Sequence, residues 1–462
     1  MKRSFLHLLL MSLVFHCCSL FVNSCAQIGA PVGGPKDTAA PILIKASPDN
    51  YQTNFNANKI SLTFDEFIEL KDLQNNFFVS PMQKNNPTVS SNLRTITIKL
   101  KDSLLTNTTY SIDLGNSIKD INEGNVFKNF SYIFSTGNFI DSLEINGKVV
   151  MAESGKPDST LKVLLYRNGV DSSVSTRKPD YITFLQGDGN FSFKNLPAGN
   201  FLIFVLKDGD GNKYYNLKSE IFAFNDREIN TTDKNDSLLL FAYAEKKTPI
   251  FTSAFDKKNA DKKLRYTTNL MNSKQDLLSP LELAFTSPLK IINLDSVFIA
   301  DTNFLPVQVI STDIDTSRKK ISISKKWKED EKFFLIFSIG AFEDSSGRKL
   351  TKADTISFKT KSISEYGSLK LVFNNLDISR HPLLEFIEAN NIKWKFPLTS
   401  NEWLNKMLAP GEYEIRILYD ENNNGEWDPG NYSRKLQPER AITLPQKISV
   451  KANWENERDV QL

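Results

Sequence analysis

Apolar and polar residues alternate along much of this 462-residue chain. The clearest runs are residues 59–64 (KISLTF), 95–100 (TITIKL) and 110–114 (YSIDL). Successive side chains of a strand point to opposite faces, so a period of two predicts strands with one buried face. Clusters of Asn, Asp, Gly and Pro separate the runs at the spacing of sandwich turns. The pattern predicts an all-β chain. Helical turns are expected only near residues 66–76, 295–298 and 400–407.

Two patterns recur along the chain. The first recurs 221 to 224 positions later: Leu62, Phe64, Tyr110, Asp120 and Phe134 correspond to Leu283, Phe285, Phe334, Asp344 and Phe358. The second recurs 212 positions later: Gly199, Phe201, Asp208, Asp210 and Asn212 correspond to Gly411, Tyr413, Asp420, Asn422 and Asn424. The repeats predict four tandem β-sandwich modules in the order A–B–A′–B′. The modules are A (42–138), B (139–246), A′ (247–361) and B′ (362–462).

The N-terminus has the layout of a secretory signal, with Lys2 and Arg3 before an apolar stretch. Ser24 then precedes Cys25, an ending that resembles a bacterial lipobox. The resemblance implies that residues 1–24 are a lipoprotein signal peptide and that Cys25 is acylated. The alternative is an uncleaved helix anchor over residues 5–22. Residues 25–41 contain Gly and Pro and few large apolar side chains, which predicts a solvated tether.

The tether also carries a family resemblance. Residues 29–38 (GAPVGGPKDT) shortly after Cys25 resemble the opening of a lipoprotein family of the Bacteroidota. That resemblance implies that a bacterial Ig-like domain of the SbsA type follows at once. Module A fits it through Phe64-Asp65-Glu66 and Phe134-Ser-Thr136. Module B, through residues 189–201, resembles the transthyretin-like or carboxypeptidase-regulatory-like sandwich.

Charge and residue types limit the function classes. The chain has 57 basic and 54 acidic residues, a balance of +3 that argues against a nucleic-acid binder. Cleavage before Cys25 would leave His381 as the last histidine, which excludes a zinc site built from His or Cys. We expect His381 to be a loop or edge residue and not the base of a Ser-His-Asp triad, because no Gly-x-Ser-x-Gly motif accompanies it. Asp65 and Glu66 remain as a candidate acid pair for a hydrolase, but neighbours on a strand point to opposite faces. We therefore expect no enzyme.

Tryptophan is concentrated in module B′. The four residues there are Trp394, Trp403, Trp427 and Trp454. Exposed aromatic rings stack on sugars, so Trp427 is a candidate glycan contact. The alternative is that these rings fill the core of the last module.

A calcium loop is the candidate metal site. Asp420, Asn422, Asn424 and Asp428 stand at positions 1, 3, 5 and 9, with a glycine at position 6. This spacing resembles a loop that wraps a hard cation with oxygen ligands. Position 12 is Asn431, where such loops usually have Glu. The corresponding loop of module B, which begins at Asp208, has Lys213 at position 6 in place of the glycine. The alternative is a hairpin turn, for which Asp, Asn and Gly are also the expected residues. No other cofactor is expected.

Together these features predict a non-catalytic, lipid-anchored rod of the cell envelope with a structural or interaction-mediating role. A glycan-binding component of a polysaccharide-handling system is the alternative. Partners would be the membrane, through the lipid, and an unidentified envelope protein or glycan. Residues 26–30 are uncharged and the first acid after Cys25 is Asp37. We therefore expect an outer-membrane lipoprotein facing the periplasm, with the cell surface as the other option.

Overall fold

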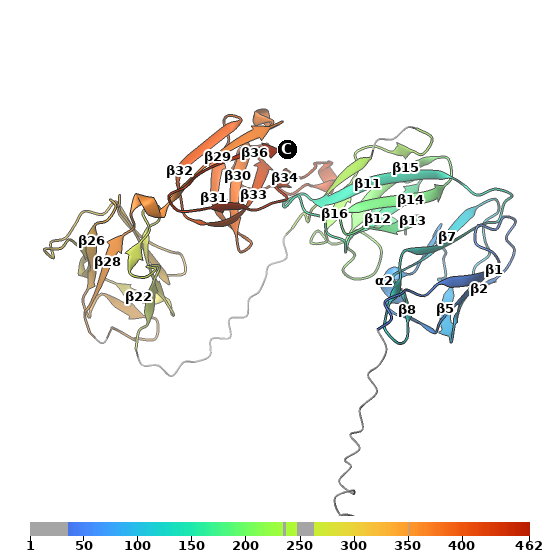
Figure 1. The fold of residues 1–462 in the computed structure, drawn as a ribbon, viewed down its shortest axis with the longest axis horizontal. Helices are drawn as coiled ribbons and strands as arrows, with labels where there is room; N and C mark the ends of the chain where they lie inside the picture. The colour runs from blue at the N-terminus through green and yellow to red at the C-terminus, as the bar shows by residue number, and fades with distance from the viewer. Residues whose placement is uncertain (1–35, 234–236, 247–262, 351) are drawn as a thin grey trace, which may run out of the picture. The chain divides into compact units, whose positions relative to one another are not determined.

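The all-β prediction is confirmed. The computed structural model describes residues 36–233, 237–246, 263–350 and 352–462, and nearly all of its regular elements are strands (Figure 1). The chain divides into two compact units, Met1–Ser142 and Leu143–Leu462. Module A lies in the first unit, and the other three predicted modules lie in the second. Within the described residues, no helix is long and apolar enough to span a bilayer.

Module A is built from two main sheets around one core. Ile60, Leu62 and Phe64 of the second strand point inward and are buried, while the residues between them face outward. The sheets have the orders β1-β2-β6-β5 and β10-β7-β4, and β3-β8-β9 forms a third, smaller sheet. The elements are β1 (Leu43–Ser47), β2 (Lys59–Phe64), β3 (Ile68–Leu70), α2 (Leu73–Asn76), β4 (Phe78–Ser80), β5 (Thr88–Asn92), β6 (Thr95–Lys99), β7 (Thr109–Gly115), β8 (Ile118–Asp120), β9 (Val126–Phe127) and β10 (Phe130–Ser135).

Module B is a sandwich of the sheets β14-β11-β18 and β13-β12-β15-β16, with β17 also paired to β15. Strand β15 is buried on both faces, because Phe201 through Leu206 form a continuous apolar run. The helical turn α3 was not predicted from the sequence. The elements are β11 (Leu143–Met151), β12 (Lys162–Arg167), α3 (Ser173–Thr176), β13 (Tyr181–Phe184), β14 (Asn190–Leu196), β15 (Asn200–Leu206), β16 (Phe222–Phe224), β17 (Ile229–Asn230) and β18 (Leu238–Ala242).

Module A′ repeats the sheet plan of module A. The orders β19-β21-β25-β24 and β20-β28-β26-β23 are accompanied by the small pair β22-β27. The elements are β19 (Tyr266–Thr268), β20 (Lys274–Gln275), β21 (Leu281–Phe285), β22 (Leu289–Ile292), η1 (Leu294–Ser296), β23 (Val297–Ala300), β24 (Ser311–Ile314), β25 (Lys320–Ser324), β26 (Lys332–Phe337), β27 (Phe342–Asp344) and β28 (Asp354–Thr360).

Module B′ repeats module B, with sheets β32-β29-β36 and β31-β30-β33-β34 and with β35 also paired to β33. In both modules the last strand runs parallel to the first, β18 on β11 and β36 on β29. The elements are η2 (Ile363–Glu365), β29 (Gly367–Asn374), η3 (Ile378–Arg380), β30 (Pro382–Glu388), β31 (Asn391–Pro397), β32 (Glu402–Leu408), β33 (Gly411–Tyr419), η4 (Tyr432–Arg434), β34 (Arg440–Thr443), β35 (Ile448–Val450) and β36 (Glu455–Gln461).

Three details of the sequence prediction are wrong. Helical turns also occur outside the three predicted stretches, at α3, η2, η3 and η4. Residues 400–407 do not form a helical turn, because β32 is a strand whose side chains alternate between half-buried and exposed positions. Tyr110 corresponds to Phe333 and not to Phe334. Tyr110 is paired with Phe134 across two strands, and the equivalent partner of Phe358 is Phe333. Tyr110 and Phe333 are both buried, so the two residues matched by strand pairing also occupy equivalent places in the cores of modules A and A′.

Module B contacts module B′ directly, although module A′ separates them in the sequence. The ring of Tyr432 in η4 packs against Phe222 and Phe224 of module B, with centroid distances of 5.0 Å to each. Its hydroxyl donates to the carbonyl oxygen of Asp171 (2.7 Å), and its backbone N–H donates to Glu245 Oε1 (3.2 Å). The outer face of the β12-β15-β16 sheet is thereby covered by a segment of module B′.

The contact is reciprocal, because a turn of module B covers the outer face of the β30-β33-β34 sheet. Arg416 Nε donates to Glu385 Oε2 (2.5 Å), and Nη1 of the same guanidinium donates to the carbonyl oxygen of Glu153 in module B (2.8 Å). Glu385 is only 1% exposed. The backbone N–H of Ala441 donates to the carbonyl oxygen of Ala152 (2.9 Å). Removing Arg416 would leave the buried Glu385 carboxylate dependent on the Lys395 ammonium, 3.8 Å away, which would compensate its charge less well.

We predict that Tyr432→Ala lowers the free energy of unfolding of the second unit by about 2 kcal/mol, because several aromatic contacts are lost together. Calorimetry on the full chain should therefore give a lower melting temperature. Tyr432→Phe keeps the ring contacts and should retain most of the stability. Tyr51→Ala, at a side chain that is 56% exposed, is the matched control. Equal melting temperatures for Tyr432→Ala and the parent chain would contradict the predicted role of this contact.

Candidate functional site

The loop after β15 in module B folds around a carboxylate. Asp208 accepts the backbone N–H of Asn212 on Oδ1 (3.1 Å) and that of Lys213 on Oδ2 (2.9 Å). Asp210 Oδ1 accepts the N–H of Asn212 as well (3.1 Å). This hydrogen bond is the largest cause of the lowered pKa of Asp210. A lowered pKa keeps the carboxyl group of Asp210 ionised at neutral pH.

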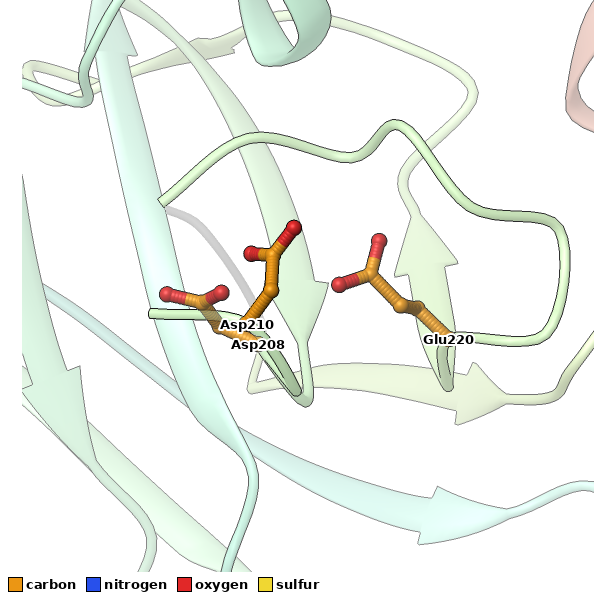
Figure 2. A group of neighbouring side chains, drawn as sticks. All are labelled: Asp208, Asp210 and Glu220. Atoms are coloured by element: carbon orange, nitrogen blue, oxygen red, sulfur yellow. The ribbon is translucent and has the colours of Figure 1, made fainter. Parts of the chain in front are cut away.

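Glu220 completes a group of three carboxylates. Figure 2 shows the three carboxylates beside one another, Glu220 coming from the end of the loop, just before β16. One oxygen each from Asp208, Asp210 and Glu220 lie within 4.8 Å of one another. Glu220 is only 6% exposed and accepts the N–H groups of Gly209 (3.4 Å) and Leu217 (3.2 Å). Three carboxylates so close repel one another, and a divalent cation would offset that repulsion.

The loop after β33 in module B′ has the same backbone arrangement. Asp420, which is fully buried, accepts the N–H of Asn424 on Oδ1 (3.0 Å) and that of Gly425 on Oδ2 (2.7 Å). Gly425 has φ +82° and its counterpart Lys213 has φ +66°, so both loops make a left-handed turn at the same position. The sequence match between the two loops is therefore also a structural match.

The other predicted ligands of module B′ are brought together around Asp428. The side-chain amides of Asn422 and Asn424 both donate to Asp428 Oδ2, at 2.5 and 2.7 Å. The amide oxygen of Asn422 accepts the N–H of Asn424 (3.1 Å), and that of Asn424 accepts the N–H of Glu426 (2.7 Å). The amide nitrogens, rather than the amide oxygens, therefore face the carboxylate here.

Glu439 is the residue of module B′ that occupies the place of Glu220. It is 6% exposed and accepts the N–H of Glu421 (2.8 Å). Glu220 accepts the N–H of Gly209, and Gly209 stands 212 positions before Glu421, which is the offset of the repeat. Burial raises the pKa of Glu439, and the negative charges of Asp420 and Asp428 raise it further. Sequence reasoning missed both glutamates, because neither stands at the twelfth position of a calcium loop and the repeat offset changes before Glu439.

Trp427 lies beside this loop and is half-buried. Its indole N–H donates to the carbonyl oxygen of Glu439 (2.9 Å), and its ring packs against Leu383, Leu418 and Ala441. Trp394 and Trp403 pack against the core of module B′. The remaining tryptophan of this module, at position 454, is 59% exposed, with the Lys451 ammonium over its ring (5.0 Å). Cys25, the predicted lipidation site, lies outside the described residues.

The candidate acid pair follows strand β2. Asp65 Oδ1 accepts the N–H of Ile42 (2.8 Å). Burial raises the pKa of Glu66, and the charges of Asp120 and Asp65 add to the shift. Asp120 is itself held by its own loop, where its oxygens accept the N–H groups of the residues that follow it: Glu123, Gly124 and Asn125. Asp344 of module A′ is buried and held by loop N–H groups in the same way.

A family model described as a bacterial Ig-like domain matches residues 37–136. Module A is a bacterial Ig-like domain. The match agrees with the resemblance on which module A was first assigned, whereas membership of a Bacteroidota lipoprotein family stays a prediction. No curated protein matches the chain.

Among solved structures, the chain is similar to the Bacillus anthracis TIE protein at 11% identity, over 93% of this chain and 75% of that one, with a TM-score of 0.18. It is also similar to BcpA, the major pilin subunit of Bacillus cereus, at 9% identity over 70% and 99% of the two chains (TM-score 0.17). The N-terminal part of the bacterial S-layer protein SbsC gives 16% identity over 45% and 44% (TM-score 0.16). These scores are too low to carry an argument about the arrangement or activity of the Ig-like domain or its neighbours.

We predict that Gly425→Ala destabilises the chain by about 1 kcal/mol, because φ is +82° and an L-residue is strained there. An added Cβ would meet no heavy atom within 4 Å, so the loss would come from the backbone alone. Gly209→Ala is the matched control in module B, since Gly209 is equally open and does not have a positive φ. Chemical denaturation of both variants measures the difference. A loss of equal size in the two variants would contradict the strain argument.

Proposed function

We propose that this chain is a non-catalytic protein of the bacterial cell envelope with a structural or interaction-mediating role. Residues 1–24 act as a signal peptide, and lipid on Cys25 holds the protein to the outer membrane, where it faces the periplasm. The bacterial Ig-like domain and the succession of sandwiches support the proposal. Fold alone does not fix function, but one contact within this molecule gives the proposed role further support.

That contact is the one between modules B and B′. Two sandwiches that module A′ separates in the sequence are held together by the Tyr432 side chain and by the hydrogen bond from the Arg416 guanidinium to the carbonyl oxygen of Glu153. Such packing orders several modules relative to one another and leaves their edges and loops for contact with other molecules. This arrangement suits a protein that braces or displays surfaces, and it supports the proposed role more than any single side chain does.

The anchor is tested by Cys25→Ser. Without the thiol there is no acceptor for the lipid, so the protein should move from the membrane fraction to the soluble periplasmic fraction. The Cys17→Ser variant, which changes a residue inside the predicted signal peptide, should stay in the membrane fraction. Mass spectrometry of the N-terminal peptide should find an acylated Cys25. Membrane association that survives Cys25→Ser would overturn the lipid anchor and leave the fold assignment untouched.

We also propose that the two loops bind calcium, in module B through Asp208, Asp210 and Glu220 and in module B′ through Asp420, Asn422, Asn424 and Asp428. In module B′ the amides of Asn422 and Asn424 would have to turn so that their oxygens, and not their nitrogens, face the ion beside Asp428. The carboxylate group of module B favours this second function, because its oxygens lie within 4.8 Å of one another. Oxygen ligands from carboxylates and amides are those that calcium prefers. Bound calcium would brace two loops that leave the central strands β15 and β33.

The expected affinity is weak, in the ~10⁻⁴–10⁻³ M range of extracellular modules. At a calcium concentration of about ten times Kd, binding should add about 1.4 kcal/mol to the stability of the full chain. Glu220→Gln should reduce this increase, whereas Glu228→Gln, at an exposed position of the same module, should not. Melting curves in chelator and in calcium measure the effect. Identical melting temperatures in the two conditions would reject calcium binding by either loop.

The pH dependence of the calcium effect follows from Glu439. Its pKa in the folded state is raised, so the folded chain takes up this proton at a higher pH than an unfolded chain does. Without calcium, the ionised form costs stability above the raised pKa, and the cost disappears as the pH falls through it. A cation bound beside Asp420 and Asp428 competes with that proton. The stabilisation by calcium should therefore shrink as the pH falls through the raised pKa, and Glu439→Gln should weaken that dependence.

A further inference from the structure

The outward face of the β1-β2-β6-β5 sheet in the Ig-like domain carries mostly polar and basic side chains, with the exposed Ile44 at the bulge of β1 as an apolar exception. Strand register places these side chains in three rows across the sheet. The rows are Lys45–Thr63–Thr95–Asn92, Ser47–Ser61–Thr97–Ser90 and Lys59–Lys99–Thr88. None of these eleven outward positions is Asp or Glu. Hydroxyl and amide groups therefore fill the middle of the face, and cations stand at its two ends.

The cations of this face lack acidic partners. Lys59 and Lys99 are directly opposite each other on neighbouring strands. Like charges in that position reduce the stability of a sheet. Across residues 36–233 and the other described ranges, no carboxylate forms an ion pair with Lys45, Lys59 or Lys99. An anion bound from outside would remove the repulsion between the two opposed lysines.

A pocket opens where the first row ends, at the turn between β5 and β6. It has a volume of about 440 Å³, and its lining includes Phe67, Leu93, Arg94 and Thr95. Phe67 is 45% exposed, and the guanidinium carbon of Arg94 lies 5.2 Å from the centroid of its ring. Asp65 and Glu66 follow β2 nearby, and Asp65 is already hydrogen-bonded to Ile42. The pocket therefore combines an aromatic ring with a cation that lies over one face of that ring.

We propose that this face binds an acidic polysaccharide. The Lys59–Lys99 pair would hold carboxylate groups, the row of hydroxyl groups would exchange hydrogen bonds with sugar hydroxyls, and Phe67 would cover the apolar face of one sugar ring. Thr95 and Lys99 are about 13 Å apart along β6 at the usual rise per residue, so the ligand is a chain of several sugars and not a single one. Charge complementarity selects the acidic chain over a neutral one.

This inference deepens the proposed interaction role by naming a partner class, and it rests on that role. The assay is a titration of the full-length chain in detergent with polygalacturonate, followed by calorimetry. The fully methyl-esterified polymer has the same sugar backbone without the charges and serves as the matched ligand. We expect binding to polygalacturonate that weakens as salt screens the charges, and binding to the ester that is at least about tenfold weaker.

Variants of Lys59 and Lys99 test the proposed contacts with carboxylate groups most directly. Lys59→Gln combined with Lys99→Gln should weaken binding about tenfold, because two exposed charge contacts are lost. The same double substitution removes like-charge repulsion, so the melting temperature should stay equal or rise, which separates lost binding from lost folding. Lys71→Gln is the control, since Lys71 is paired with Glu69 (2.5 Å) away from this face. It should bind as the parent chain does.

Three results would overturn the inference. The first is equal affinity for polygalacturonate and its methyl ester, and the second is binding that is unchanged in the Lys59→Gln, Lys99→Gln variant. The third is binding to vesicles of anionic phospholipid together with no binding to polygalacturonate, which would make the face a membrane contact. None of these results bears on the anchor at Cys25, so failure of this inference and failure of the proposed function are distinguishable.

Discussion

Burial of both faces of one sheet is the constraint on which the second unit depends. A sandwich hides the inner face of each sheet, and the outer face normally meets water. In module B the outer face of β12 and β15 carries Tyr166 and Phe204, and both are almost completely buried. Phe204 is covered by η4 of module B′, whose Tyr432 ring is 5.8 Å away, whereas Tyr166 lies under the Arg177 guanidinium of its own module (5.0 Å). The outer face of module B′ is covered by its own Trp427 and by the turn of module B that carries Glu153. Each module thus supplies part of the cover for the other.

Carboxylates that accept backbone N–H groups are a second common element, and they organise loops. In the Ig-like domain and in module A′, Asp120 and Asp344 stand at equivalent positions and accept backbone N–H groups of the residues after them. Asp208 and Asp420 do the same in modules B and B′. An ionised group is expensive to bury unless such donors surround it. The same kind of hydrogen bonding thus closes a loop in every module, and in module B it also brings Asp210 and Glu220 within 4.8 Å of the aspartate.

The sequence predicts the sheets well because a period of two is a local property. Ile60, Leu62 and Phe64 alternate with polar neighbours, and they are buried as that alternation requires. The same logic fails for Ser400–Met407, where β32 is an edge strand with Leu404 exposed, so the alternation of apolar residues is incomplete. Glu220 and Glu439 were missed for another reason. Each reaches its loop from beyond the turn, and no fixed spacing connects it to the first aspartate.

One feature of the sequence does indicate that the outer face of module B is covered. Strand β15 is apolar at every position from Phe201 to Leu206, a run without the alternation expected of a half-buried strand. Such a run indicates two covered faces, but it does not say which segment covers the second one. That segment, η4, lies more than 200 residues further along the chain, and only the folded arrangement identifies it.

Because the chain is synthesised from its N-terminus, the contact between modules B and B′ can form only after module B′ has been made. Asp171 precedes Tyr432 by 261 positions, so the outer face of module B is made long before the segment that covers it. A chain that leaves the ribosome or a translocation channel from its N-terminus exposes Phe204 and Phe222 until nearly the whole of module B′ has followed. Contacts between distant positions form slowly, and exposed apolar strands aggregate. Biogenesis of this protein therefore includes an interval in which part of the outer face of module B meets water.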